Sequence, residues 1–207
     1  MLDAALQPLQ RRALTPVARF MVARGVSADS ATLTGFALGV MALIFIVNEA
    51  YLAALAFILL NRLFDGLDGA IARLTRPTDR GAFLDIALDF FFYATVPLGF
   101  AVADPAANAL PAAVVITAFV GTGSSFLAFA VIAAQRGLPA SAFTGKGIHY
   151  LSGLTEGTET IAFFVAICLF PGYFGAIAIG FALACLITTF TRWIQGMQTF
   201  RDSGSAS

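Results

Sequence analysis

The sequence has 207 residues, of which 59% are hydrophobic and 12% are charged, and its formal net charge is zero. Soluble domains are nearer about 45–50% hydrophobic and about 25% charged. This composition excludes a disordered chain, a basic nucleic-acid-binding protein and an ordinary soluble enzyme. We therefore expect an all-α integral membrane protein.

The N-terminal segment, residues 1–28, has arginines scattered among apolar residues. A signal peptide would instead have a compact basic start followed by a continuous apolar stretch. Val17, Phe20, Met21 and Arg24 follow helical spacing. The pattern predicts a juxtamembrane amphipathic helix that lies at the membrane surface, with its arginines reaching the headgroups. The alternative is a poorly ordered tail.

Six apolar segments follow, and a membrane-spanning helix needs about 20 mostly apolar residues. The expected spans are 31–47, 51–73, 81–103, one within 105–135, and two within 160–191. The last stretch is too long for one span, and Pro171-Gly172 interrupt it. Residues 29–196 are thus predicted to form a six-helix transmembrane domain, and residues 197–207 a disordered tail.

The basic residues indicate how these spans are oriented. With six spans, both termini and the loops after the second and fourth spans share one side of the membrane. All twelve basic residues fall on that side: Arg11, Arg12, Arg19, Arg24, Arg62, Arg73, Arg76, Arg80, Arg136, Lys146, Arg192 and Arg201. The partition supports six spans, and the positive-inside rule makes this side cytoplasmic.

The cytoplasmic halves of the second and third spans carry acids, which are costly at membrane depth and mark function. A helical turn of about 100° per residue gathers the small and acidic residues on one arc of each span. The two arcs are Asp65, Asp68, Gly69 and Ala72 on the second span, and Gly81, Asp85 and Asp89 on the third. The short turn of residues 74–80 predicts an antiparallel hairpin in which the two acidic faces meet.

Four carboxylates that lie this close repel one another, and a divalent cation relieves the repulsion. Oxygen-only ligands favour a hard ion such as Mg²⁺ or Mn²⁺. Four carboxylates can hold two ions, and two ions suit phosphoryl chemistry.

The neighbouring residues of the two arcs fit a phosphate ligand. The arcs are kept free of bulky side chains by Gly69, Ala72 and Gly81, so that a ligand can approach the backbone. Arg73 is the basic residue nearest to the aspartates in the sequence, and it could bind a phosphate through two hydrogen bonds. The alternative is a set of buried ion pairs, in which Arg73 pairs with an aspartate and Arg62 pairs with Asp65 or Asp68.

The pattern Asp65-x-x-Asp68-Gly69-x-x-Ala72-Arg73, seven residues, Gly81-x-x-x-Asp85-x-x-x-Asp89 resembles the signature of the CDP-alcohol phosphatidyltransferase family. The resemblance implies an enzyme that moves a phosphatidyl group, a substituted phosphate, from CDP-diacylglycerol to an alcohol hydroxyl and releases CMP. It also implies two divalent cations, Mg²⁺ or Mn²⁺, as cofactors. The partners it implies are CDP-diacylglycerol, a small alcohol and membrane lipids, without nucleic acid.

The resemblance also assigns roles to the residues of the signature. Asp65, Asp68 and Asp85 would be metal ligands, and Asp89 would touch the second ion and act as general base on the acceptor hydroxyl. For the nucleotide, Arg73 would hold the diphosphate, while Gly69 and Gly81, with Ala72 beside them, would make room for the cytidine. The family further implies a homodimer, with its active site on the cytoplasmic face of a bacterial inner membrane.

The acceptor site is expected among polar residues that follow the fourth span. Lys146, Arg136 and Arg192 would bind a phosphorylated acceptor such as glycerol 3-phosphate or inositol phosphate. Glu156 and Glu159 could instead favour an acceptor that carries an amine, such as serine. Other interpretations stay open: positive-inside topology for Lys146 and Arg136, snorkelling for Arg192, and a helix N-terminus for the two glutamates.

Two rival functions use the same kinds of residue. An intramembrane prenyltransferase also uses aspartates and Mg²⁺ on a lipid diphosphate, but it has two separated acidic motifs where this sequence has one. A cation transporter would distribute acids through the membrane depth and often contain internal repeats. Here the four aspartates lie near one face, and the sequence contains no repeat.

Overall fold

The computed structural model describes residues 2–138 and 153–201. Every regular element in these two ranges is helical, which confirms the all-α prediction. The helices are α1 (Leu2–Ala23), α2 (Ala28–Val47), α3 (Tyr51–Leu74), α4 (Asp79–Ala103), α5 (Pro105–Gln135), α6 (Gly157–Leu169) and α7 (Phe174–Thr199). A single 3-10 turn, η2 (Pro171–Tyr173), joins the last two helices.

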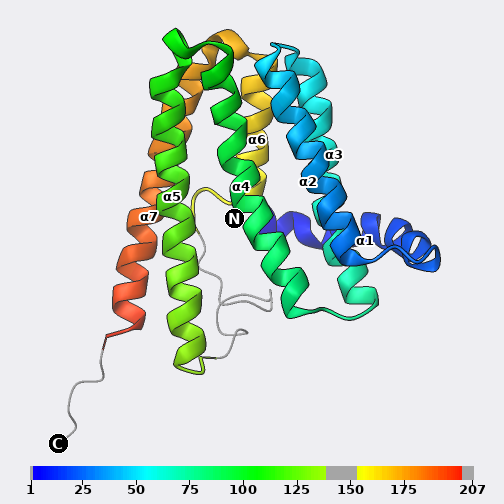
Figure 1. Cartoon of the computed structure of the whole chain (residues 1–207). Helices are drawn as coiled ribbons and strands as arrows, with labels where there is room; N and C mark the ends of the chain where they lie inside the picture. The colour runs from blue at the N-terminus through cyan, green and yellow to red at the C-terminus, as the bar shows by residue number, and fades with distance from the viewer. Residues whose placement is uncertain (1, 139–152, 202–207) are drawn as a thin grey trace, which may run out of the picture.

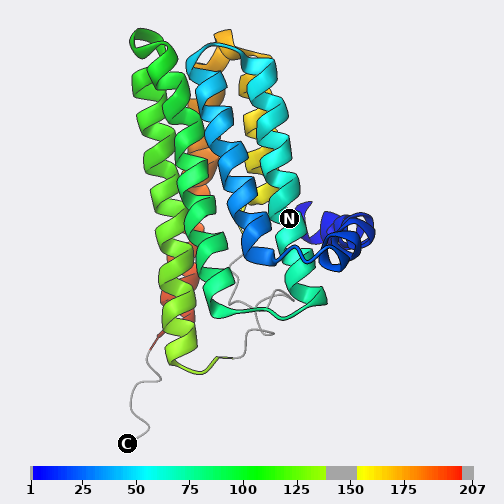
Figure 2. The same cartoon turned by 45° about the vertical axis from the view of Figure 1, so that its right-hand side comes forward.

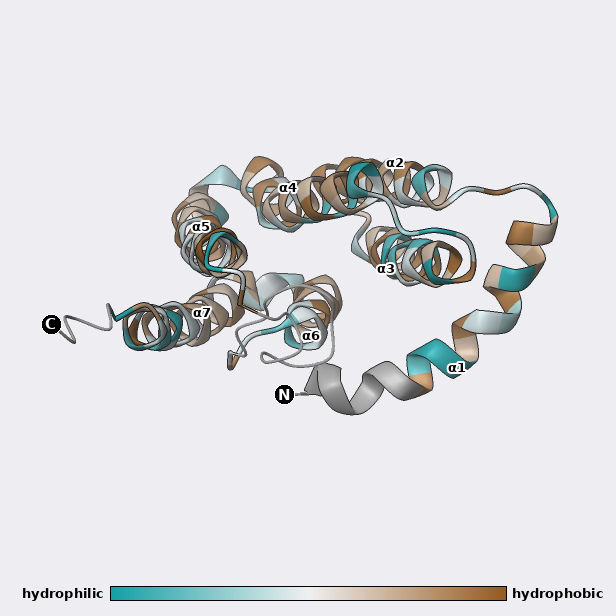
Figure 3. Ribbon diagram, turned by 90° about the horizontal axis from the view of Figure 1, so that it is seen from below, coloured by the Kyte–Doolittle hydropathy of each residue, from teal (hydrophilic) through white to brown (hydrophobic). Residues whose placement is uncertain are grey.

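The helices from α2 to α7 stand side by side in one bundle, and α1 runs across it at one end (Figures 1 and 2). Seen along the bundle, α2, α4, α5 and α7 form an arc, with α3 and α6 on its inner side (Figure 3). The first helix packs against α3, where Ala18 joins Leu67, Ala70 and Ile71 in a small buried cluster. The N-terminal segment is therefore helical, and its position at a membrane surface stays a prediction.

Within residues 2–138 and 153–201, four helical stretches are long and apolar enough to cross a membrane: Ala28–Val47, Asp79–Ala103, Pro105–Gln135 and Pro171–Thr199. Their number supports a multi-pass membrane protein. Two of the expected spans, the helices α3 and α6, are not among these four, for separate reasons. Helix α3 is long enough, but Arg62 lies at its middle, and Asp65 and Asp68 lie in its second half. Helix α6 has 13 residues and is about 20 Å long, which is short of a hydrocarbon core of about 30 Å. Six spans therefore stay a prediction.

Helix α7 continues to Thr199, past residue 197, where the tail was predicted to begin. Residues 202–207 lie outside the described residues.

The prediction that the second and third spans pack directly against each other as a hairpin is wrong. Helix α3 packs mainly against α2, whereas α4 packs against both α2 and α5, and α3 and α4 do not pack closely against each other. Two glycines of α2 permit this, because an added Cβ would lie 3.1 Å from the Phe64 Cβ at Gly35 and 2.7 Å from the Phe92 ring at Gly39. Helix α2 thus acts as a spacer, and the two acidic arcs face each other across a gap instead of a tight helix interface.

The end of the bundle away from α1 is held by stacked aromatic rings. The Phe100 and Phe174 rings stack at 4.6 Å between centroids, and the Phe163 and Phe181 rings at 4.3 Å. Such stacks add specific geometry to the burial of large apolar side chains. This part of the core joins α4, α6 and α7, so the polar residues near α1 sit on a well-packed support.

Candidate active site

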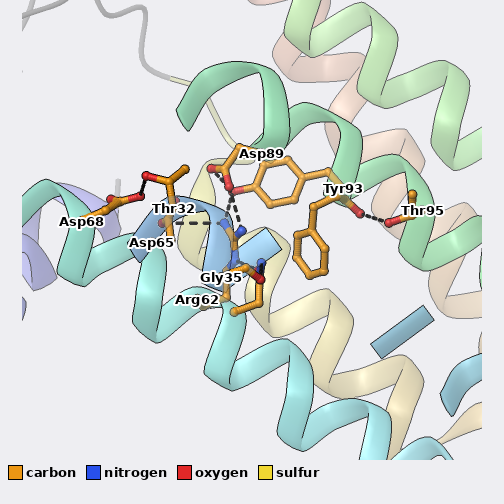
Figure 4. A network of polar contacts seen from close by, with 10 residues as sticks. Thr32, Gly35, Arg62, Asp65, Asp68, Asp89, Tyr93 and Thr95 are labelled. Carbon is orange, nitrogen blue, oxygen red and sulfur yellow. Dashed lines mark hydrogen bonds and ion pairs between the residues drawn. The ribbon is translucent and has the colours of Figure 1, made fainter. Parts of the chain in front are cut away.

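Three aspartates converge at the polar end of the bundle. One carboxylate oxygen from each of Asp65, Asp68 and Asp85 lies within 4.8 Å of the others. Asp65 and Asp68 share one side of α3 because they are three residues apart. The Thr32 hydroxyl of α2 donates a 2.6 Å hydrogen bond to Asp68 Oδ2 (Figure 4). Asp68 itself is buried. The prediction that the two acidic arcs meet is confirmed.

A small space of about 10 Å³ lies among all four aspartates, between Thr32 and Arg62. A volume of this size is comparable with one water-sized sphere. The surrounding carboxylate and hydroxyl oxygens are the donors that Mg²⁺ and Mn²⁺ prefer. The residues therefore fit a divalent cation, held by Asp65, Asp68 and Asp85, and the number of ions stays a prediction.

The start of α4 sets the direction of its acidic arc. Thr78 caps the helix, because its Oγ1 accepts a 3.0 Å hydrogen bond from the Gly81 amide. Side-chain caps of this kind satisfy one of the unpaired amides at a helix N-terminus. From that fixed start, Asp85 and Asp89 follow one turn apart on the side that faces α3.

The fourth aspartate is bound by a buried arginine. Arg62 Nη2 donates a 2.7 Å hydrogen bond to Asp89 Oδ1, while Arg62 Nη1 lies 3.7 Å from Asp65 Oδ2. The ion-pair interpretation is thus confirmed for Arg62 with Asp65, although the shorter bond goes to Asp89. The expected pair of Arg73 with an aspartate is not among the ion pairs of the described residues, and Arg73 is exposed.

The small residues of the arcs leave room beside the aspartates. A Cβ added at Gly69 would meet only the end of one side chain, Arg73 Nη1, at 3.3 Å. At Gly81 it would meet Thr78 Oγ1 at 3.1 Å and Asp29 Oδ1 at 3.3 Å. Packing within the chain therefore does not require glycine at position 69, which is consistent with the approach of a ligand there. Ala72 is half-buried on the same helix.

A larger cavity of about 640 Å³ adjoins the aspartates. Asp65, Asp85 and Asp89 form one wall of this cavity, which we call the acidic wall. Arg62 of α3 and Gln10 of α1 also line the cavity. Further lining residues come from α5, α6, α7 and the residues before α6, including Thr122, Phe126, Thr155, Glu156, Thr160 and Arg192. Aromatic residues of α4 and α5, among them Tyr93 and Phe119, also contribute.

Among the expected acceptor residues, Arg192 lines this cavity and Arg136 does not. Arg192 is 7% exposed, and its Nη1 donates a 3.0 Å hydrogen bond to the Thr122 carbonyl. A buried arginine that lines a polar cavity is unlike a snorkelling side chain. Arg136 is exposed at the end of α5 and donates to the Phe200 carbonyl at 3.2 Å. Lys146 lies outside the described residues.

The two glutamates form the cap of α6. The Glu156 side chain accepts from the helix backbone, and Glu159 Oε2 accepts a 3.0 Å hydrogen bond from the Glu156 amide. This reciprocal arrangement is a capping box, so the helix-terminus interpretation is confirmed. Glu156 nevertheless also lines the large cavity, while Glu159 is not among its lining residues.

Three site residues were missed from the sequence, namely Thr32, Asn61 and Tyr93. Asn61 and Arg62 form a polar pair inside the apolar run of the second span, and that interruption was a readable signal. Thr32 and Tyr93 gave none, because a threonine or tyrosine in an apolar helix is common. Thr32 contacts Asp68 because α2 packs against α3, whereas Tyr93 contacts Asp89 one turn away on the same helix, α4.

Comparison with known proteins agrees with this geometry. Residues 26–193 match the sequence model of the family described as CDP-alcohol phosphatidyltransferase. The chain is 51% identical over 202 residues to the inner membrane protein YnjF of Escherichia coli K12, covering 98% of both chains. It is 41% identical over 92 residues to the phosphatidylinositol phosphate synthase of Streptomyces avermitilis, covering 43% of this chain and 37% of that one.

Solved structures share the fold. The phosphatidylinositol phosphate synthase PgsA1 of Mycobacterium tuberculosis with CDP-DAG bound has a TM-score of 0.66 at 23% identity, covering 90% of this chain and 94% of that one. The same enzyme in complex with manganese and citrate has a TM-score of 0.67 at 23% identity, covering 94% and 93%. With the family match over most of its length, this chain belongs to the CDP-alcohol phosphatidyltransferase family.

Proposed function

We propose that the protein transfers a phosphatidyl group from CDP-diacylglycerol to the hydroxyl of a small alcohol and releases CMP. One observation carries this proposal most directly: three aspartates converge to within 4.8 Å, and two of them, Asp65 and Asp85, line a large cavity together with Asp89. This arrangement supports a cation-binding cluster and a separate carboxylate base beside a space large enough for a substrate. The CDP-DAG bound to the related PgsA1 supports the same donor.

The reaction needs a base because an alcohol is a poor nucleophile until its proton is removed. In the proposed step, Asp89 takes the proton from the acceptor hydroxyl. The alcohol oxygen then forms a bond to the phosphorus that carries the diacylglycerol. The bond from that phosphorus to the bridging oxygen breaks, and the oxygen and its electron pair leave with CMP.

Asp65, Asp68 and Asp85 would hold a divalent cation, and Asp89 would contribute to binding a second one. When bound, Mg²⁺ or Mn²⁺ neutralises negative charge on the diphosphate and stabilises the leaving CMP. Arg73 would bind the diphosphate, and its position over the open side of Gly69 supports that role. Ala72 and Gly81 complete the low-bulk surface proposed for the nucleotide.

The large cavity is the proposed acceptor site, and Arg192 is its proposed anchor. A buried guanidinium binds a phosphate through charge-assisted hydrogen bonds, so it favours a phosphorylated alcohol. The arginine opposes the acidic wall, which leaves the acceptor hydroxyl free to reach Asp89. Glu156, which lines the same cavity, supports the alternative of an amine-bearing alcohol such as serine.

The proposed setting is a bacterial inner membrane, with six spans, the active site on the cytoplasmic face and α1 at the membrane surface. The separation of basic residues to one side supports this orientation. Such a site lets the acyl chains of the donor stay in lipid while its nucleotide is in water. We further propose a homodimer, as the family resemblance implies.

The test is CMP release from CDP-diacylglycerol by the purified protein with Mg²⁺ or Mn²⁺. The acceptors would be glycerol 3-phosphate, inositol phosphate, inositol, serine, ethanolamine and choline. Release that requires the metal and one acceptor is expected, and the identity of that acceptor decides between Arg192 and Glu156 as its main contact. Protein that binds neither CDP-diacylglycerol nor Mn²⁺ would contradict the proposal.

A further inference from the structure

We infer that Arg62 is a positioning residue that holds Asp89 in the orientation needed to take the acceptor proton. The inference rests on the proposed function, because it concerns the base of that reaction. Arg62 lies outside the signature from Asp65 to Asp89, and its role follows from its contacts in the folded chain. Figure 4 shows its guanidinium between Asp65, Asp89 and Tyr93.

A chain of hydrogen bonds across three helices fixes the guanidinium. Asn61 Nδ2 donates to the Gly35 carbonyl of α2 at 2.7 Å, and Asn61 Oδ1 accepts from Arg62 Nε at 2.7 Å. On α4, Arg62 Nη2 donates to Asp89 Oδ1 at 2.7 Å, and Arg62 Nη1 donates to the Tyr93 hydroxyl at 3.1 Å. The Nε of the guanidinium is therefore held by residues of α2 and α3, while its Nη2 is directed at Asp89.

Aromatic rings fix the plane of the same guanidinium. Arg62 is 9% exposed, and its Cζ lies 4.7 Å from the Phe92 ring centroid and 5.1 Å from the Tyr93 ring centroid. An arginine supplies five N–H donors in a rigid plane, so rings on its faces and acceptors at its edge leave it one orientation. A lysine ammonium could pair with one carboxylate here, but it could not contact Asn61, Tyr93 and Asp89 together.

The contacts distinguish the two oxygens of Asp89. Oδ1 takes the short bond from Arg62, while Oδ2 lies 3.5 Å from the Tyr93 hydroxyl. The Asp65 side chain also lies within hydrogen-bonding reach of the Asp89 carboxyl. Asp89 also lines the large cavity. Arg62 therefore fixes the carboxylate through one oxygen and leaves the other for the acceptor hydroxyl.

A role in stability alone does not account for this arrangement. Burying a charged pair carries a large desolvation penalty, and apolar residues of similar volume are often as stable in such a place. Here the shortest bond of the network goes to Asp89, the one signature aspartate that lies outside the three-aspartate cluster, while the contact with Asp65 inside the cluster is longer. This is the residue for which a small change in orientation would matter most to the reaction.

The test compares three variants of the full-length protein with the wild type. Arg62→Lys keeps the positive charge but loses the planar guanidinium. Tyr93→Phe removes the hydroxyl that contacts Arg62 and Asp89. Arg201→Met is a matched control at an exposed arginine. The readouts are kcat and KM for CMP release, Mn²⁺ affinity by electron paramagnetic resonance, and the experimental structure of Arg62→Lys with Mn²⁺.

For Arg62→Lys we expect kcat to fall about 100-fold, with the KM for CDP-diacylglycerol and the Mn²⁺ affinity within about 3-fold, because a misplaced group slows the reaction without changing ligand binding. Tyr93→Phe should lower kcat about 5-fold by the same reasoning. The Asp89 carboxylate should rotate in the Arg62→Lys structure while Asp65, Asp68 and Asp85 stay together.

Three results would overturn the inference. The first is wild-type kcat in both variants, and the second is a loss of Mn²⁺ affinity that accounts for the loss of kcat. The third is an unmoved Asp89 carboxylate in the Arg62→Lys structure, a result that does not depend on activity. If Arg62→Lys does not fold, an unchanged kcat in Tyr93→Phe overturns it. A wild-type protein without CMP release would contradict the proposed function instead.

Discussion

The two sides of the large cavity are built in opposite ways. The acidic wall comes from two helices that follow each other in the chain, and its aspartates lie between Asp65 and Asp89. The facing side, which we call the Arg192 wall, combines Thr122 of α5, Glu156 before α6 and Arg192 of α7. One wall is a local motif, and the other exists only in the folded chain.

This difference predicts that the two walls have different functions. Under the proposed function, the acidic wall would supply the features that every reaction of this class needs, a metal-binding site and a base. The Arg192 wall carries a cation, an acid and hydroxyls whose combination can recognise one acceptor. Changes in the acidic wall should therefore abolish chemistry with any acceptor, while changes in the Arg192 wall should alter acceptor affinity.

The largest effect is expected for Asp85→Asn, which removes a charge from the centre of the metal cluster. We predict a fall in kcat of at least about 1000-fold, because the cation contributes several kcal/mol to the transition state. Mn²⁺ affinity should fall in parallel. The matched control is Asp104→Asn at the N-cap of α5, where asparagine also caps well. Normal Mn²⁺ binding by Asp85→Asn would argue against the cluster as the metal site.

The next effect is expected for Arg192→Met on the facing side. Loss of a charge-assisted hydrogen bond should raise the KM for a phosphorylated acceptor about 10- to 100-fold. The KM for CDP-diacylglycerol and the Mn²⁺ affinity should stay near their wild-type values. An equal loss of donor and acceptor binding would remove the distinction between the two walls.

A smaller effect is expected for Gly69→Ala. Alanine favours a helix over glycine by about 1 kcal/mol, and the added Cβ meets only Arg73 Nη1, so thermal stability should not fall. The KM for CDP-diacylglycerol should nevertheless rise about 10-fold if the nucleotide approaches this backbone. The control is Gly180→Ala on α7, where an added Cβ has nothing within 4 Å. Equal activity in both variants would mean that the donor does not contact Gly69.

The smallest effect is expected for Arg136→Met. This arginine is exposed and contacts the Phe200 carbonyl and ring outside the cavity. Exposed charges of this kind contribute little, so the acceptor KM should change less than about 2-fold. A change of 10-fold or more would extend the acceptor site beyond the Arg192 wall and restore the original expectation for Arg136.

The contrast between the walls also explains how far the sequence could be interpreted. The all-helical class, the acidic arcs and the family signature depend on composition and on spacing within single helices, so they were predictable. The packing of α3 and α4 on α2 was not, because it depends on close contacts at Gly35 and Gly39. The sequence suggested three basic acceptor residues, but only the fold separates Arg192, in the cavity, from Arg136, outside it.

Arg62 illustrates the same limit from within the acidic wall. Its ion pair with Asp65 follows from helical spacing, since the two residues are three positions apart. Its shorter bond to Asp89 joins two helices that are held apart by α2, and no spacing rule predicts it.

The most direct test of the account is to compare CMP release by the wild type and by Asp89→Asn, with Mn²⁺ and CDP-diacylglycerol binding measured on the same preparations. We predict that Asp89→Asn binds both ligands but releases CMP at least about 100-fold more slowly, since it lacks the base that takes the acceptor proton. Release by Asp89→Asn at the wild-type rate would contradict the account.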